Sequence, residues 1–122
     1  GNPTHPITKN IRPVRLQFTT QIDTLKNDAI TKTPLLVSSL LTSKLGTPNF
    51  VDLKTVAEEP TENTYKSGHQ LLGVLLEGKF NSAYKNRIKP FETPLYKDIS
   101  KSNKMVVIAD GDIAKNQIFQ KN

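Results

Sequence analysis

The chain has 122 residues, about one domain's worth, with 35% hydrophobic residues and a formal net charge of +6. No apolar stretch approaches the roughly 18 residues that a membrane helix needs, and no low-complexity tract suggests a disordered tail. The sequence therefore predicts a soluble, folded piece of protein. Because it contains no cysteine, it excludes disulfides, thiolate metal sites and a cysteine nucleophile.

The N-terminal half predicts three strands. Residues 14–23 alternate apolar and polar side chains, which is typical of a strand with one wet face. An apolar run after a proline predicts a buried strand at 34–38, and residues 50–56 fit a third strand. The polar residues 58–68 should form an exposed connection.

Two continuous apolar runs, at 71–76 and 105–109, are the strongest signals in the sequence. Both are too short for ordinary helices, and runs of this kind are typical of central strands covered on both faces. Each run leads into an acid–glycine pair, Glu77-Gly78 in the first case and Asp110-Gly111 in the second. We expect both strands to be central and these pairs to be the turns that end them.

Helices are expected after both turns, at 82–87 and 113–120. Strand, tight turn and helix in succession predict an α/β fold, with a mixed sheet of about four or five strands flanked by helices. The strand at 14–23 should lie nearer an edge. Residues 1–122 are expected to form a single domain, or a fragment of a longer protein, with Gly1 left over from removal of a tag.

Three acidic residues that follow the apolar runs are candidates for a ligand-binding cleft: Glu77, Asp110 and Asp112. Ligands of open α/β sheets bind beyond the carboxyl ends of the strands. Asp110 and Asp112 together would also suit Mg²⁺ and a metal-dependent hydrolase. The simpler interpretation, which we favour, is that Asp112 caps the following helix and that Gly111 supplies the turn. No metal site is predicted.

A basic segment between the two apolar runs, residues 84–104, carries most of the net charge. It has six basic residues against two acidic ones and contains two prolines, which argue against a long helix. A solvated loop is the favoured interpretation, and a surface for an anionic partner is the alternative; the irregular spacing does not favour nucleic acid. The candidate surface residues are Lys85, Arg87, Lys89, Lys97, Lys101 and Lys104.

Catalytic motifs are missing from the sequence. The phosphate-binding patterns GxxxxGK[ST] and GxGxxG are absent, so the chain is not expected to be an ATP-hydrolysing subunit. His5 and His69 show no metal-ligand spacing. A triad of Ser38 or Ser39 with His69 and Asp110 lacks the G-x-S-x-G turn that would expose the serine. We predict no catalytic residues and no cofactor.

Four blocks of sequence resemble the gliding-motility-associated ABC-transporter accessory proteins, a family sometimes labelled as a substrate-binding component. The third and fourth blocks are the most specific, and residues 49–68 match least. In chain order the blocks are HPITK (5–9) with FTTQIDTL (18–25), TPLLVSS (33–39), VLLEGKFNS (74–82) with KNR (85–87), and VVIADGD (106–112) with KN (115–116).

This resemblance implies a membrane-anchored, extracytoplasmic (periplasmic) protein that works with an ABC ATPase and a permease, and with other envelope proteins. It also implies a fold similar to part of a class I glutamine-amidotransferase-like domain. The amidotransferase nucleophile is a cysteine, and the chain has none. The family supplies no catalytic residues.

The expected function is therefore that of a non-enzymatic extracytoplasmic domain of an ABC-transporter accessory subunit, acting through protein or ligand contacts. A sugar- or peptide-binding module is the first alternative. The metal-dependent hydrolase that uses Asp110 and Asp112 is the second.

Overall fold

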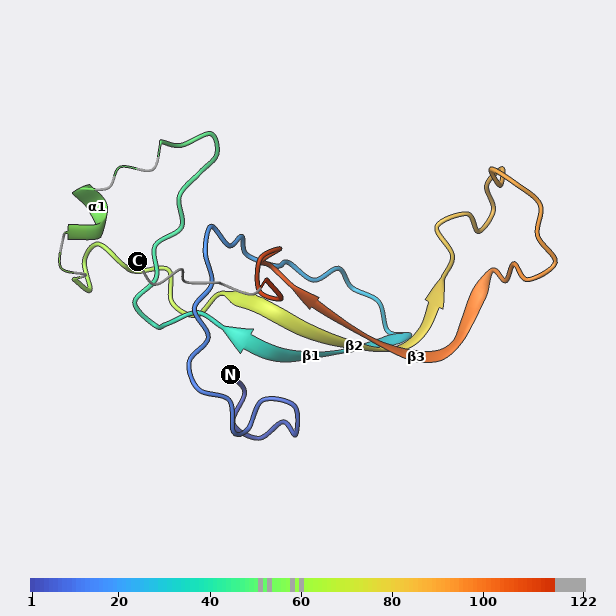
Figure 1. The fold of residues 1–122 in the computed structure, drawn as a ribbon, viewed down its shortest axis with the longest axis horizontal. Coiled ribbons are helices and arrows are strands. Elements are labelled where there is room, and N and C mark those ends of the chain that lie inside the picture. Colours follow the sequence, from blue (N-terminus) through green and yellow to red (C-terminus); the bar gives the residue numbers. More distant parts are fainter. Residues whose placement is uncertain (51, 53, 58, 60, 116–122) are drawn as a thin grey trace, which may run out of the picture.

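The computed structural model describes residues 1–50, 52, 54–57, 59 and 61–115. Three strands, β1 (Ile30–Val37), β2 (Leu71–Asn81) and β3 (Ile99–Ile108), form one antiparallel sheet in the order β1-β2-β3 (Figure 1). A single helical turn, α1 (Lys54–Ala57), lies in the connection between β1 and β2. Within the described residues no helix is long and apolar enough to span a bilayer.

The sheet has a small core, because few side chains are fully covered. Val74 and Leu75 of β2 are 2% and 3% exposed, and Leu35 of β1 is 3% exposed. A β-bulge at Leu35 shifts the register between Pro34 and Leu36. Leu36 then packs against Gly73, where a β-carbon would come within 3.1 Å of the Leu36 side chain.

Gly78 lies inside β2 and does not end it, contrary to the turn predicted at Glu77-Gly78. Its φ of 149° belongs to a region that side chains with a β-carbon rarely adopt. A β-carbon here would also fall on the carbonyl oxygen of Ala29. Glycine therefore lets β2 run close beside Ala29, the residue before β1, and continue to Asn81.

Residues 14–23 do not form the predicted strand. The segment is instead fastened to the sheet at separate points, where the Ile22 amide donates to the Leu71 carbonyl at 2.9 Å and the Thr19 hydroxyl donates to the Ala109 carbonyl at 2.8 Å. Phe18 between them has a φ of 49° and is 88% exposed. This left-handed residue breaks the extended backbone that a period of two requires.

The helix predicted at 82–87 is absent. Its residues form turns, because the Lys85 amide bonds the Ser82 carbonyl and the Arg87 amide bonds the Tyr84 carbonyl, three residues back in each case. Asn86 has a φ of 60°, which interrupts any helix.

Two further predictions for the connecting segments fall partly on residues outside the described ranges. The helix predicted at 113–120 begins with a turn up to residue 114, and its part beyond residue 115 lies outside the described residues. Of the strand predicted at 50–56, residues 54–56 belong to α1, and residues 51 and 53 lie outside the described residues.

The predicted α/β class is therefore wrong: the described residues form an antiparallel sheet without flanking helices. The run at 71–76 does lie in the central strand β2, as expected, but the run at 105–109 falls mainly in β3, at an edge. A continuous apolar run resembles a buried parallel strand, but here Val74 and Leu75 of β2 are buried, whereas residues 105–107 of β3 remain 37–49% exposed at an edge. The resemblance to a class I glutamine-amidotransferase-like fold is not supported by this architecture.

Candidate interaction surface

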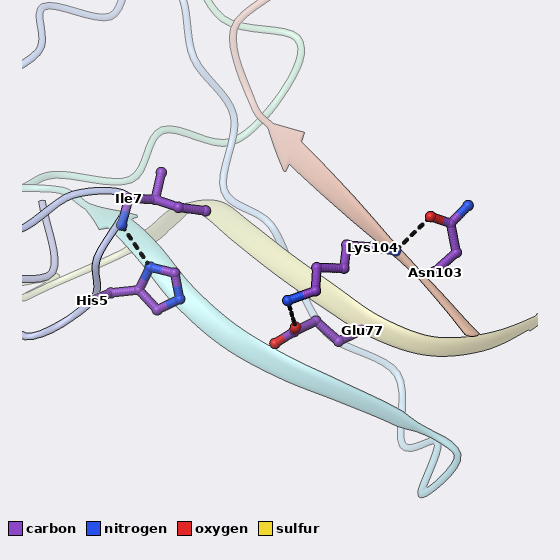
Figure 2. Close-up of polar contacts among 5 residues, drawn as sticks. All are labelled: His5, Ile7, Glu77, Asn103 and Lys104. Carbon is purple, nitrogen blue, oxygen red and sulfur yellow. Dashed lines mark hydrogen bonds and ion pairs between the residues drawn. The ribbon is translucent and has the colours of Figure 1, made fainter.

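Glu77 is paired with a basic residue of the neighbouring strand. It lies opposite Lys104 in the β2–β3 register, and its Oε1 accepts from the Lys104 Nζ at 2.7 Å (Figure 2). The two side chains are 32% and 73% exposed. The carboxylate thus forms a cross-strand ion pair at the surface of the sheet.

Asp110 organises the chain after β3. Its Oδ2 accepts from the Gln17 amide at 2.8 Å, and its Oδ1 accepts from the Asp112 amide at 2.8 Å. Asp112 is exposed, and its carbonyl accepts from the Lys115 amide in the turn that follows. Both oxygens of Asp110 therefore hold backbone N–H groups, one local and one from the N-terminal segment.

The sheet separates Glu77 from the other two acidic residues. Glu77 lies opposite Lys104, and Asp110 is six residues further along the chain, which corresponds to roughly 20 Å of extended strand. The prediction that they share one edge assumed parallel strands, but β2 and β3 are antiparallel. Among the residues described, no three acidic or histidine side chains come together as a metal-binding group.

Each histidine makes a hydrogen bond to a main-chain group. Nδ1 of His5 accepts from the Ile7 amide at 3.2 Å (Figure 2), and Nδ1 of His69 lies 2.8 Å from the Ser38 carbonyl oxygen, to which it can only donate. The Ser38 hydroxyl accepts from the Gln70 amide. The His69 ring thus bonds the Ser38 carbonyl, and the Ser38 hydroxyl bonds the Gln70 amide. Together these bonds join the end of β1 to the start of β2.

The six candidate basic residues divide into two groups. Lys101 and Lys104 lie on β3, where Lys104 pairs with Glu77. The other four lie in the connection between β2 and β3, at positions Lys85, Arg87, Lys89 and Lys97. Residues 82–98, here called the projecting loop, extend away from the sheet as one excursion (Figure 1).

The projecting loop closes on itself at its base and exposes apolar side chains beyond it. The Ser82 amide donates to the Asp98 carbonyl at 2.8 Å, which joins its two ends. Ile88 is 96% exposed, Leu95 84% and Phe91 69%. The loop thus exposes three large apolar side chains within residues 88–95, and exposed apolar surface of this kind can mark an interaction site.

Basic and aromatic groups meet within the same loop. The Lys89 Nζ lies 3.8 Å from the centre of the Tyr96 ring, a cation–π contact. The Ser82 hydroxyl lowers the pKa of Tyr96, but loss of solvation and the Asp98 carboxylate outweigh it and hold that pKa above its usual value. Tyr96 therefore stays neutral near neutral pH. A hollow of about 650 Å³ is lined by Arg87, Ile88, Lys89, Glu92, Thr93 and Pro94.

The basic residues of this loop are evident in the sequence as a charge excess, whereas its exposed apolar side chains were not predicted as part of a surface. Ile88, Phe91 and Leu95 are three and four residues apart, as on one face of a helix, but Pro90 and Pro94 lie among them and oppose a helix. That conflict was the available signal, because apolar residues at helical spacing that cannot form a helix have no helix face through which to be buried.

The sheet, its fastened N-terminal segment and its projecting loop define a non-helical scaffold whose most prominent surface combines basic and apolar side chains. The chain belongs to the family described as ABC-type uncharacterized transport system, whose sequence model matches residues 1–122. It is thus an auxiliary protein of an ABC transport system, and membership implies association with transporter components. No curated protein and no solved structure matches the chain.

Proposed function

We propose that the chain is a non-enzymatic, extracytoplasmic accessory domain that docks on a membrane subunit of its transport system through the projecting loop. The observation that carries the proposal is the exposure of Ile88 and Leu95, at 96% and 84%, beside basic side chains. Apolar anchors surrounded by a polar rim are the usual form of a protein-binding patch. Extracytoplasmic placement, an anchored parent and a permease–ATPase pair of the gliding-associated type follow the sequence resemblance and are part of the same proposal.

The charges of the loop suit an acidic partner face. Arg87 and Lys97 are exposed, and neither has an ion-pair partner within the described part of the chain. Charges at the rim of an interface chiefly raise the association rate and depend on salt. The apolar side chains should therefore set the lifetime of the complex, and the basic ones its rate of formation.

Site-specific photo-crosslinking in cells tests this directly. A photoreactive residue at Phe91, 69% exposed in the loop, should give an adduct with the permease. The matched control is a photoreactive residue at Leu45, 65% exposed in the connection between β1 and β2. Adducts from position 45 with none from position 91 would refute docking through the loop.

A peptide-binding role is a second candidate, favoured by one feature. The segment 22–27 arches over one face of the sheet and leaves a groove of about 380 Å³. Its lining is mainly apolar and includes Val74, Leu76, Phe80 and Val107, which suits an apolar extended peptide better than a sugar. A thermal-shift screen with peptide and sugar libraries decides: a specific peptide should raise the melting temperature, and a response to sugars alone would contradict this candidate.

A further inference from the structure

The projecting loop, residues 82–98, has neither helix nor strand in it to hold its shape, and all of its residues are described. The Ser82 amide and the Asp98 carbonyl close its base. Its other backbone hydrogen bonds each span three residues, so they fix turns within one arm of the loop, 82–89 or 92–98. Among these described residues, no hydrogen bond or ion pair joins the two arms beyond the base.

One side-chain contact does join the arms. The Nζ of Lys89 in the first arm lies 3.8 Å from the centre of the Tyr96 ring in the second. An ammonium group over the face of a tyrosine ring is attracted by the negative charge of the ring's π electrons. The hollow of about 650 Å³ is lined by residues 87–89 and 92–94, so it lies between the same two arms. The contact therefore holds together two arms that the backbone alone leaves separate.

The hydroxyl end of Tyr96 lies near the base of the loop. Its oxygen is covered, and Ser82 and Asp98 both act on the pKa of the phenol. The Ser82 hydroxyl lowers that pKa, whereas loss of solvation and the Asp98 carboxylate raise it and prevail. Among the described residues no hydrogen-bond partner engages the hydroxyl oxygen. Packing of the ring, rather than a hydrogen bond, therefore holds Tyr96 in place.

The contact fixes the two residues that follow the most exposed apolar side chains of the loop. Lys89 comes directly after Ile88, which is 96% exposed, and Tyr96 comes directly after Leu95, which is 84% exposed. Holding Lys89 against Tyr96 limits how far these apolar side chains move apart. A surface that is ordered before binding loses less conformational entropy in the complex.

We propose that Tyr96 is the positioning residue of the projecting loop: its ring holds Lys89 of the opposite arm, so that Ile88 and Leu95 are presented at a fixed spacing before a partner binds. The ordering of the loop is a property of the free chain. Its consequence for affinity rests on the proposed docking function, so the two are measured separately.

Nuclear magnetic resonance of the free 122-residue chain tests the ordering of the loop. In the wild-type chain, the ring current of Tyr96 should shift the ε-methylene protons of Lys89 upfield. Tyr96→Leu should abolish that shift and speed exchange of the Ser82 amide, which closes the base, by at least about threefold. Tyr96→Phe keeps the ring and should retain both signals, because the hydroxyl that it removes makes no hydrogen bond to the described residues. Tyr65→Leu, which changes a half-buried tyrosine outside the loop, is the matched control.

Affinity for the purified permease tests the consequence for docking. Tyr96→Leu should raise the dissociation constant about three- to tenfold, since the loop must then be ordered on binding, and Tyr96→Phe should restore the wild-type value. An unchanged Lys89 shift and unchanged Ser82 exchange in Tyr96→Leu would overturn the proposal, and so would full affinity in a chain whose loop has loosened. Loss of both signals in Tyr96→Leu, together with a wild-type chain that does not bind the permease, would support the positioning role and refute the docking function.

Discussion

The Lys104 Nζ lies 2.7 Å from the Glu77 Oε1, which makes an ion pair across the antiparallel strands β2 and β3. Removing either side chain should destabilise the sheet only slightly, because the lysine is 73% exposed. We expect a coupling energy of about 0.2–1 kcal/mol from a double-mutant cycle with Glu77→Ala and Lys104→Ala, measured by urea unfolding. A coupling energy well above that range would mean that the pair is shielded from solvent.

Gly78 should be far less tolerant of substitution than Gly111. Gly78→Ala places a β-carbon on the Ala29 carbonyl oxygen at a φ of 149°, so both the contact and the backbone are strained. We expect a loss of at least about 2 kcal/mol in the free energy of unfolding. Gly111→Ala, which has open space around the new β-carbon, should change it by less than about 0.5 kcal/mol. Equal losses would show that β2 does not pass Ala29 closely.

Leu75 is predicted to carry much of the stability of the small core. It is 3% exposed on the central strand, so Leu75→Ala should cost about 2–5 kcal/mol in denaturant unfolding. Leu45→Ala, at a position that is 65% exposed, is the matched control and should cost about 0.5 kcal/mol or less. The prediction fails if the two variants unfold at the same denaturant concentration.

Asp110 should hold the N-terminal segment beside the end of β3 through its hydrogen bond with the Gln17 amide. Asp110→Ala removes the acceptor of the Gln17 and Asp112 amides, so both amides should exchange with solvent at least about tenfold faster. Asp110→Asn keeps one side-chain oxygen acceptor and should preserve part of the protection. Added Mg²⁺ should leave exchange in the wild-type chain unchanged, whereas protection by the ion would revive the metal-site interpretation of Asp110 and Asp112.

Local patterns in the sequence predicted where the strands β2 and β3 lie, but not how the strands pair or the class of the fold. The apolar runs at 71–76 and 105–109 do form strands, because β-branched and leucine side chains there fit a pleated surface. Their direction could not be inferred, because a parallel and an antiparallel partner leave the same apolar pattern. The α/β interpretation rested on Gly78 as a turn, whereas the glycine is needed for a close approach to Ala29, a residue distant in sequence.

The candidate site residues could be named from the sequence, but their positions relative to one another could not be predicted. Basic residues between 84 and 104 were found by counting charges, but only the structure separates those of the projecting loop from those of β3. Glu77 was expected beside Asp110, and the antiparallel register places them far apart. The left-handed residues Phe18 and Asn86, which end the expected strand and helix, have no signature strong enough to predict them.

The affinity of the chain for the purified permease tests docking through the projecting loop most directly. The double variant Ile88→Ser and Leu95→Ser should bind at least about tenfold more weakly, since it removes two apolar anchors. Leu40→Ser and Leu45→Ser, both 65% exposed outside the loop, should leave binding unchanged. Equal affinity of the loop variant and the wild-type chain would contradict the account.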